Sequence, residues 1–185
     1  TTPFISVYAW SGSGFGTRFA NPGTLPNSSC GGVAFSPAGD AIAVVHQNSP
    51  FVSAYPWSGS GFGTRFANPA TAVSAIPFCV TFSPSGDAVF VGITKTFAFE
   101  PYVEVYAWSA SGFGAKLSAP SDVGVGSVQG IDFDATGQFV GFAHQNTGRV
   151  AVLPWTIGGG FGAQVSAPAT PPTGNGTGIA FTINP

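Results

Sequence analysis

Short apolar runs alternate with clusters of Gly, Pro, Ser and Asn along the whole chain. Runs such as AIAVVH at residues 41–46 are rich in β-branched and aromatic side chains, which is typical of short strands. Near the N-terminus, Tyr8 and Trp10 share one face of such a run, while Ile5 and Val7 occupy the other face. A strand that is apolar on both faces is covered on both faces, so the pattern predicts an all-β fold of packed sheets.

The apolar runs belong to a tandem repeat. The segment PFISVYAWSGSGFGTRFANP at residues 3–22 recurs as PFVSAYPWSGSGFGTRFANP at residues 50–69 and twice more with further changes, and successive tryptophans are 47, 51 and 47 residues apart. A second segment, GVAFSPAGDAIAVVHQ, interleaves with the first, and its last copy is the truncated GIAFTINP. Each unit predicts four strands, exemplified by VAFSP, AIAVVH, FVSAYPW and FGTRFA, with a Pro-x-Gly-Asp turn whose Gly takes a positive φ.

Two features of the repeat carry a resemblance. The FSPxGD turn and the strand that ends in aromatic-x-Trp resemble the WD-repeat type of β-propeller, although Ser or Thr follows each Trp where that family has Asp. The wording Tyr-x-Trp-Ser-x-x-Gly-Phe-Gly is similar to repeat propellers of bacteriophage and environmental sequences, which implies an extracellular or virion-associated protein. We therefore predict one propeller domain over residues 1–185, made of a half-unit 3–30, repeats 31–77, 78–128 and 129–176, and a closing inner strand 177–185.

The strand count is one short of four complete four-stranded blades. The missing strand is the equivalent of AIAVVHQ, between the C-terminal GIAFTINP and the N-terminal FISVYAW. Because unpaired strand edges are costly, we expect something to fill the gap. One hypothesis is that chains associate head to tail into a homo-oligomer, such as a dimer with eight blades; the alternative is a monomer with one three-stranded blade.

Composition excludes several classes of function. With 5 Lys and Arg residues and a net charge of −2, the chain predicts no nucleic-acid partner. No apolar run approaches the length of a membrane-spanning helix, so no membrane partner is predicted. Cys30 and Cys79 show no zinc-ligand spacing and are expected to be free, largely buried thiols, and no cofactor is predicted.

Repeated positions are expected to serve packing and edge protection. A Trp at one fixed position of every unit favours packing between blades over stacking on sugars. Arg18, Arg65 and Lys116 share one position on the outermost strand, where charge discourages further strand pairing.

A residue that breaks the repeat is a better pointer to chemistry. Asp132 and Asp134 replace Ala, Thr and Ser of the other units, and two carboxylates at i and i+2 project from one strand face. They could share a cation or divide acid and base roles. The favoured alternative is that Asp134 caps the following turn and Asp132 meets solvent, which makes the pair a weak metal candidate.

The sequence HQN forms a second polar cluster. It occurs between the second and third strands of two units, at the end of the fold where propellers bind ligands. Neutral imidazoles beside amides suit hydrogen bonding to a sugar or peptide. The candidate ligand-binding residues are His46, Gln47, Asn48, His144, Gln145 and Asn146.

No catalytic triad, phosphate loop or dinucleotide fingerprint occurs in the chain. We therefore predict a non-enzymatic binding or structural module, such as a protein–protein scaffold. Two alternatives stay open: a carbohydrate-binding propeller, and an enzyme with its site at Asp132 and Asp134.

Overall fold

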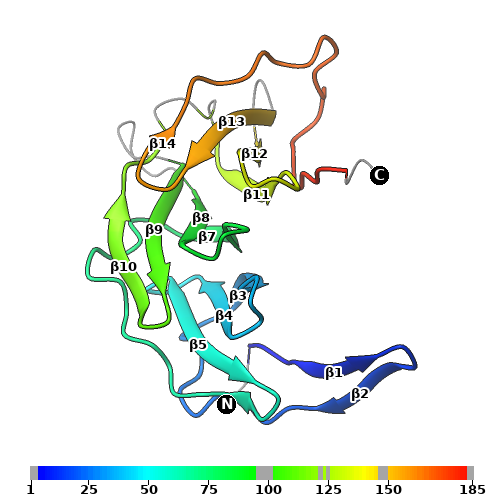
Figure 1. Cartoon of the computed structure of the whole chain (residues 1–185), viewed down its shortest axis with the longest axis vertical. Coiled ribbons are helices and arrows are strands. Elements are labelled where there is room, and N and C mark those ends of the chain that lie inside the picture. Colours follow the sequence, from blue (N-terminus) through cyan, green and yellow to red (C-terminus); the bar gives the residue numbers. More distant parts are fainter. Residues whose placement is uncertain (1–3, 95–101, 121–122, 124–125, 146–149, 183–185) are drawn as a thin grey trace.

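The computed structural model describes residues 4–94, 102–120, 123, 126–145 and 150–182. The described residues form fourteen strands and no helix, which confirms the all-β prediction, and so none of them forms a helix long and apolar enough to cross a bilayer. The strands lie in four antiparallel sheets, which follow one another along an open arc in Figure 1. We call these sheets blades 1 to 4.

Blade 1 has two strands and each of the other blades has four, as the repeat predicts. In blades 2 to 4 the strand order in space follows the chain, with the first strand on the inside of the arc (Figure 1). The strands are β1 (Tyr8–Ser11) and β2 (Gly14–Arg18) in blade 1; β3 (Cys30–Phe35), β4 (Ala41–His46), β5 (Val52–Ser58) and β6 (Gly61–Phe62) in blade 2; β7 (Pro77–Phe82), β8 (Ala88–Ile93), β9 (Val103–Ser109) and β10 (Gly112–Leu117) in blade 3; and β11 (Val128–Phe133), β12 (Phe139–His144), β13 (Val150–Thr156) and β14 (Gly160–Phe161) in blade 4.

The first turn of each complete blade is built as predicted. Gly39, at the Pro-x-Gly-Asp turn of blade 2, has a φ of 69°, which a residue with a side chain rarely adopts. The Ser36 hydroxyl accepts hydrogen bonds from the backbone N–H groups of Asp40 (3.1 Å) and Ala41 (2.9 Å). Ser83 caps the turn of blade 3 in the same way, so this serine starts the second strand in both blades.

The outermost strand is shorter than predicted in two blades. It has 2 residues in blades 2 and 4, but 5 in blade 1 and 6 in blade 3. The neighbouring strand carries Pro56 in blade 2 and Pro154 in blade 4, where blades 1 and 3 have Ala9 and Ala107. Because proline has no N–H, it cannot donate to the ladder, and the pairing ends sooner.

The core lies between blades. Its buried residues form three clusters, and each cluster joins residues from successive blades. At the junctions, an aromatic ring from the segment after one outermost strand packs edge-to-face on the Trp of the next blade: Phe19 on Trp57 at 4.9 Å and Phe66 on Trp108 at 5.3 Å between centroids. This confirms the predicted inter-blade packing role for Trp57 and Trp108, whereas Trp10 in blade 1 is 72% exposed and packs on Phe15 of its own blade.

The C-terminal segment follows blade 4 on the inside of the arc. The backbone N–H of Phe181 donates to Asp132 Oδ2 at 2.9 Å, and a Cβ on Gly141 would meet the side chains of Ile179 and Phe181. The segment therefore occupies the place expected of a further inner strand, although residues 178–182 form no ladder that qualifies them as a strand.

Candidate functional site

The HQN cluster of blade 2 has its histidine inside the blade. His46 is fully buried; its Nδ1 lies 2.9 Å from the carbonyl oxygen of Asn48, and its Nε2 lies 2.9 Å from Ser53 Oγ. Burial lowers the pKa of His46, the bond to the Asn48 carbonyl opposes that shift, and the charge of Arg65 adds to it. The imidazole is thus neutral and committed to internal hydrogen bonds, and only Gln47 and Asn48 expose their side chains to solvent.

The second HQN cluster follows the same plan. His144 is buried at the end of β12 and Gln145 is half-buried, with its backbone N–H donating to the Ser127 carbonyl at 3.0 Å. Asn146 lies outside the described residues. The two clusters therefore offer amide groups rather than imidazoles to a ligand, and ligand binding by those amides stays a prediction.

Both aspartates of the repeat-breaking pair have partners within the chain. Asp134 accepts hydrogen bonds from Thr136 and from the backbone N–H of Phe139 (2.8 Å), so it caps its turn as Ser36 does. Burial alone would raise the pKa of Asp134, but these hydrogen bonds outweigh burial and lower it. Asp132 holds the C-terminal segment through Phe181. The described residues contain no group of three or more His, Cys, Asp or Glu side chains that could hold a metal ion.

A different polar cluster, which the sequence patterns did not single out, lies in blade 3. Glu104 on β9 is fully buried, and its Oε1 lies 2.7 Å from Lys116 Nζ on β10. The same Oε1 accepts hydrogen bonds from the Ser74 hydroxyl (2.7 Å) and the Ser74 backbone N–H (3.3 Å), while Oε2 accepts one from the Tyr106 hydroxyl at 2.7 Å. We call Ser74, Glu104, Tyr106 and Lys116 the Glu104 cluster.

The charges of Glu104 and Lys116 both lie close to the Tyr106 side chain. Burial raises the pKa of Tyr106, and the hydrogen bond to the Glu104 carboxylate and its negative charge raise it further. Lys116 Nζ also lies 5.9 Å from the centre of the Tyr106 ring. Ser74 belongs to the connecting segment between blades 2 and 3 and is exposed, so the cluster has one face open to solvent.

This arrangement corrects the role expected for Lys116. Its side chain does not guard an edge; it lies over the sheet and pairs with a buried carboxylate. Arg18 stays exposed, and its guanidinium donates to Ser6 Oγ at 3.2 Å and to Asn21 Oδ1 at 2.6 Å. The sequence does mark Glu104 as a departure from the repeat, because the equivalent positions of the other units hold Ser6, Ser53 and Ala151.

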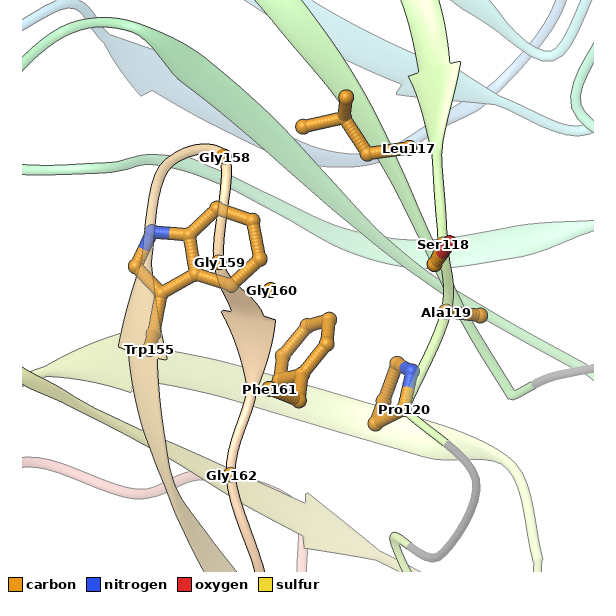
Figure 2. Close-up of a pocket in the computed structure, with 10 residues that line it drawn as sticks. All are labelled: Leu117, Ser118, Ala119, Pro120, Trp155, Gly158, Gly159, Gly160, Phe161 and Gly162. Atoms are coloured by element: carbon orange, nitrogen blue, oxygen red, sulfur yellow. The ribbon is translucent and has the colours of Figure 1, made fainter.

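A hollow opens at the junction of blades 3 and 4. Figure 2 shows Trp155 and Phe161 facing Leu117 and Pro120 across it, with the glycine turn 158–160 at its rim. Its volume is about 330 Å³. Leu117 stands where the other junctions have Phe19 and Phe66, so a smaller side chain lines the hollow at this position of the repeat.

The geometry is that of β-propellers, and solved structures share it. The chain is similar to a periplasmic gluconolactonase of Pseudomonas aeruginosa (18% identity, TM-score 0.64, covering 91% of this chain and 52% of that one). It is also similar to a gluconolactonase of Xanthomonas campestris, XC5397 (18% identity, TM-score 0.52, covering 75% and 41%), and to the WD40 repeats of RRP9 (11% identity, TM-score 0.54, covering 77% and 40%). No family model and no curated protein matches the sequence.

These comparisons show that the chain has the β-propeller fold, which gluconolactonases and WD40 repeats share, and they confirm the predicted fold class. The chain spans about half the length of the structures it matches, or less. They also require a correction: the prediction of a non-enzymatic binding or structural module is wrong, because several propellers of this fold are named as enzymes. The Glu104 cluster joins residues that are far apart in the sequence, so no contiguous motif marks it.

Proposed function

We propose that the chain is a propeller hydrolase that opens a lactone or ester of a sugar acid, with Ser74 as the nucleophile and Glu104 as the general base. The observation that carries the proposal is the distance of 2.7 Å between the Ser74 hydroxyl and Glu104 Oε1, within a cluster that blades 2 and 4 lack. A nucleophile and a base within hydrogen-bond reach, with the base oriented by a third group, are the parts of an acyl-transfer site. Tyr106 and Lys116 are that orienting set.

The reaction that follows from this arrangement has two steps. Ser74 Oγ attacks the carbonyl carbon while its proton passes to the Glu104 carboxylate; the bond from the carbonyl carbon to the ring oxygen breaks, and that oxygen takes the proton from Glu104. Water then attacks the acyl-serine with Glu104 again accepting the proton, and the free acid leaves as Ser74 regains its hydrogen. The names of the propellers that share this fold support a sugar lactone as the substrate class.

The test uses the purified chain with D-glucono-δ-lactone in weak buffer, followed by acid release. All four residues of the Glu104 cluster come from one chain. We therefore expect the purified chain alone to release acid faster than the lactone does in buffer without protein. Ser74→Ala and Glu104→Gln should each lower kcat by about 100-fold or more, since loss of a general base costs about 10²–10⁴-fold.

Thr71→Ala is the matched control, because Thr71 is exposed on the same connecting segment and contributes nothing to the cluster. Circular dichroism confirms that each variant folds. Hydrolysis no faster than in buffer, or equal hydrolysis by Ser74→Ala and the parent chain, would refute the proposal.

The fold likeness to a periplasmic gluconolactonase also supports a place outside the cytoplasm. The finer prediction of an extracellular or virion-associated protein rests on the repeat wording alone. The location is tested by fractionating cells that naturally produce the protein and detecting it with an antibody in the cytoplasmic, periplasmic and extracellular fractions.

A further inference from the structure

The tryptophans of blades 2 and 3 each pack against a ring that comes from the preceding blade. Phe66 lies edge-to-face on Trp108 at 5.3 Å between centroids, and the junction of blades 1 and 2 repeats this pair. The matching residue before blade 4 is Leu117, which has no ring. Trp155 therefore has no aromatic partner from that position of the repeat.

A glycine in each outermost strand forms the floor on which this ring lies. A Cβ placed on Gly112 would meet the Phe66 ring at 2.9 Å, and Gly61 approaches Phe19 in the same way, at 3.3 Å. Both glycines are buried. Gly160 holds the equivalent place in blade 4, where it is half-buried, and a Cβ on it would meet no heavy atom of the described residues within 4 Å. The place that a phenylalanine ring fills at the two earlier junctions is therefore open at this one.

The turn that leads into β14 also departs from the repeat. Six positions separate Trp155 from Phe161, whereas five separate the equivalent residues of blades 2 and 3, so this turn is one residue longer. Its residues 158–160 are all glycines, which carry no side chain over the hollow in Figure 2. The backbone N–H and C=O groups of the turn and the exposed Ser118 hydroxyl thus lie at the rim.

The repeat itself shows which chemistry fits the hollow. At the two earlier junctions the same place takes one benzene ring, which packs edge-to-face on a Trp, and such pairs contribute more than the area they bury. The volume of the hollow, about 330 Å³, lies within the range of about 300–1,000 Å³ that is typical of small-molecule sites. Trp155 is only 3% exposed, which favours a small molecule over the surface of a partner protein.

We propose that the junction of blades 3 and 4 is a binding site for a small molecule that carries one benzene ring and one polar substituent. The ring takes the place over Gly160 that a phenylalanine takes at the earlier junctions, and it packs against Trp155. The substituent reaches the rim, where Ser118 and the turn backbone supply hydrogen-bond partners. No residue of the Glu104 cluster is among the described residues that line the hollow, so the proposal does not depend on the proposed hydrolysis.

Benzyl alcohol is the probe, because it is a benzene ring with one hydroxyl-bearing substituent. It is titrated into the ¹⁵N-labelled full chain while NMR follows the backbone amides of residues 158–160 and the Trp155 indole N–H. We expect saturable shifts of these signals with a Kd of about 1 mM, which is usual for very small ligands. Cyclohexylmethanol, which carries the same substituent on a ring without π electrons, should bind about fivefold more weakly.

Two variants at one position separate the ring site from general binding. Leu117→Phe places a ring of the chain itself in the hollow, and the saturable shifts should be lost. Leu117→Ile is the matched control, because it keeps the size of the side chain and adds no ring, and its Kd should stay within about twofold of the parent value. Circular dichroism confirms that each variant folds.

Saturable shifts at residues 158–160 that Leu117→Phe removes and Leu117→Ile retains support the site. The proposal is overturned if the parent chain shows no saturable shifts at these residues, or if Leu117→Phe binds benzyl alcohol as the parent does. Equal binding of cyclohexylmethanol also overturns it, because the site would then not select an aromatic ring.

Discussion

Replacing Lys116 by Met isolates the ion pair at the centre of the Glu104 cluster. Lys116 Nζ lies 2.7 Å from Glu104 Oε1, and the carboxylate is fully buried while the lysine side chain is 25% exposed. Breaking a fully buried pair costs about 3–5 kcal/mol, and an exposed pair contributes less than about 1 kcal/mol. Because the lysine is partly solvated and the carboxylate keeps its hydroxyl donors, we expect Lys116→Met to lower the free energy of unfolding by about 2 kcal/mol.

Urea denaturation at pH 7, followed by circular dichroism, measures this loss. Arg65→Met is the matched control, because Arg65 holds the same position in blade 2, where Ser53 replaces the carboxylate and the guanidinium hydrogen-bonds Asn68. We expect this change to cost less than about 1 kcal/mol. The double variant Glu104→Ser and Lys116→Met, which removes both charges, should recover at least half of the loss. If Lys116→Met costs no more than Arg65→Met, or if the two changes in blade 3 simply add, the buried-pair account is wrong.

Four further predictions concern packing, titration and assembly. Leu117→Phe should fill the hollow beside Trp155 and raise stability by about 1 kcal/mol, seen as a higher Tm; an unchanged or lower Tm would show that the site cannot accept the ring. Since the pKa of Tyr106 is raised in the folded chain, stability should fall as pH rises above about 10, where an unfolded tyrosine ionises, and Tyr106→Phe should reduce this alkaline loss in urea titrations. Burial raises the pKa of the Cys30 thiol. Burial also raises the pKa of the Cys79 thiol, to about 12, although a backbone hydrogen bond from Gly92 opposes that shift. Iodoacetamide at pH 8 should therefore modify Cys79 more slowly than Cys30, and equal rates would contradict this prediction. Light scattering tests the predicted homo-oligomer, which a mass of 18.6 kDa would exclude.

The repeat made the blades predictable, because packing residues must recur wherever one blade meets the next. The strands, the glycine turns and the inter-blade tryptophans could all be read from aligned units. The length of the outermost strand was overestimated, since the effect of Pro56 on pairing depends on which edge its missing N–H would face. The Glu104 cluster was missed because Ser74 lies on a connecting segment that differs between units, thirty positions before Glu104.

The departures of blade 3 from the repeat form one coupled set, and this coupling has a physical cause. In blade 2, His46 hydrogen-bonds Ser53, whereas blade 3 has Ile93 and Glu104 at these two positions. Loss of the His46 imidazole alone would leave Ser53 without its hydrogen-bond partner. A buried carboxylate alone would have no group to balance its charge. Glu104 is tolerated in blade 3 because Lys116, Tyr106 and Ser74 surround its carboxylate. The buried polar residues of blade 3 therefore differ from those of blade 2 as a group, and such a group in one blade is where a repeat protein can hold chemistry that its other blades lack.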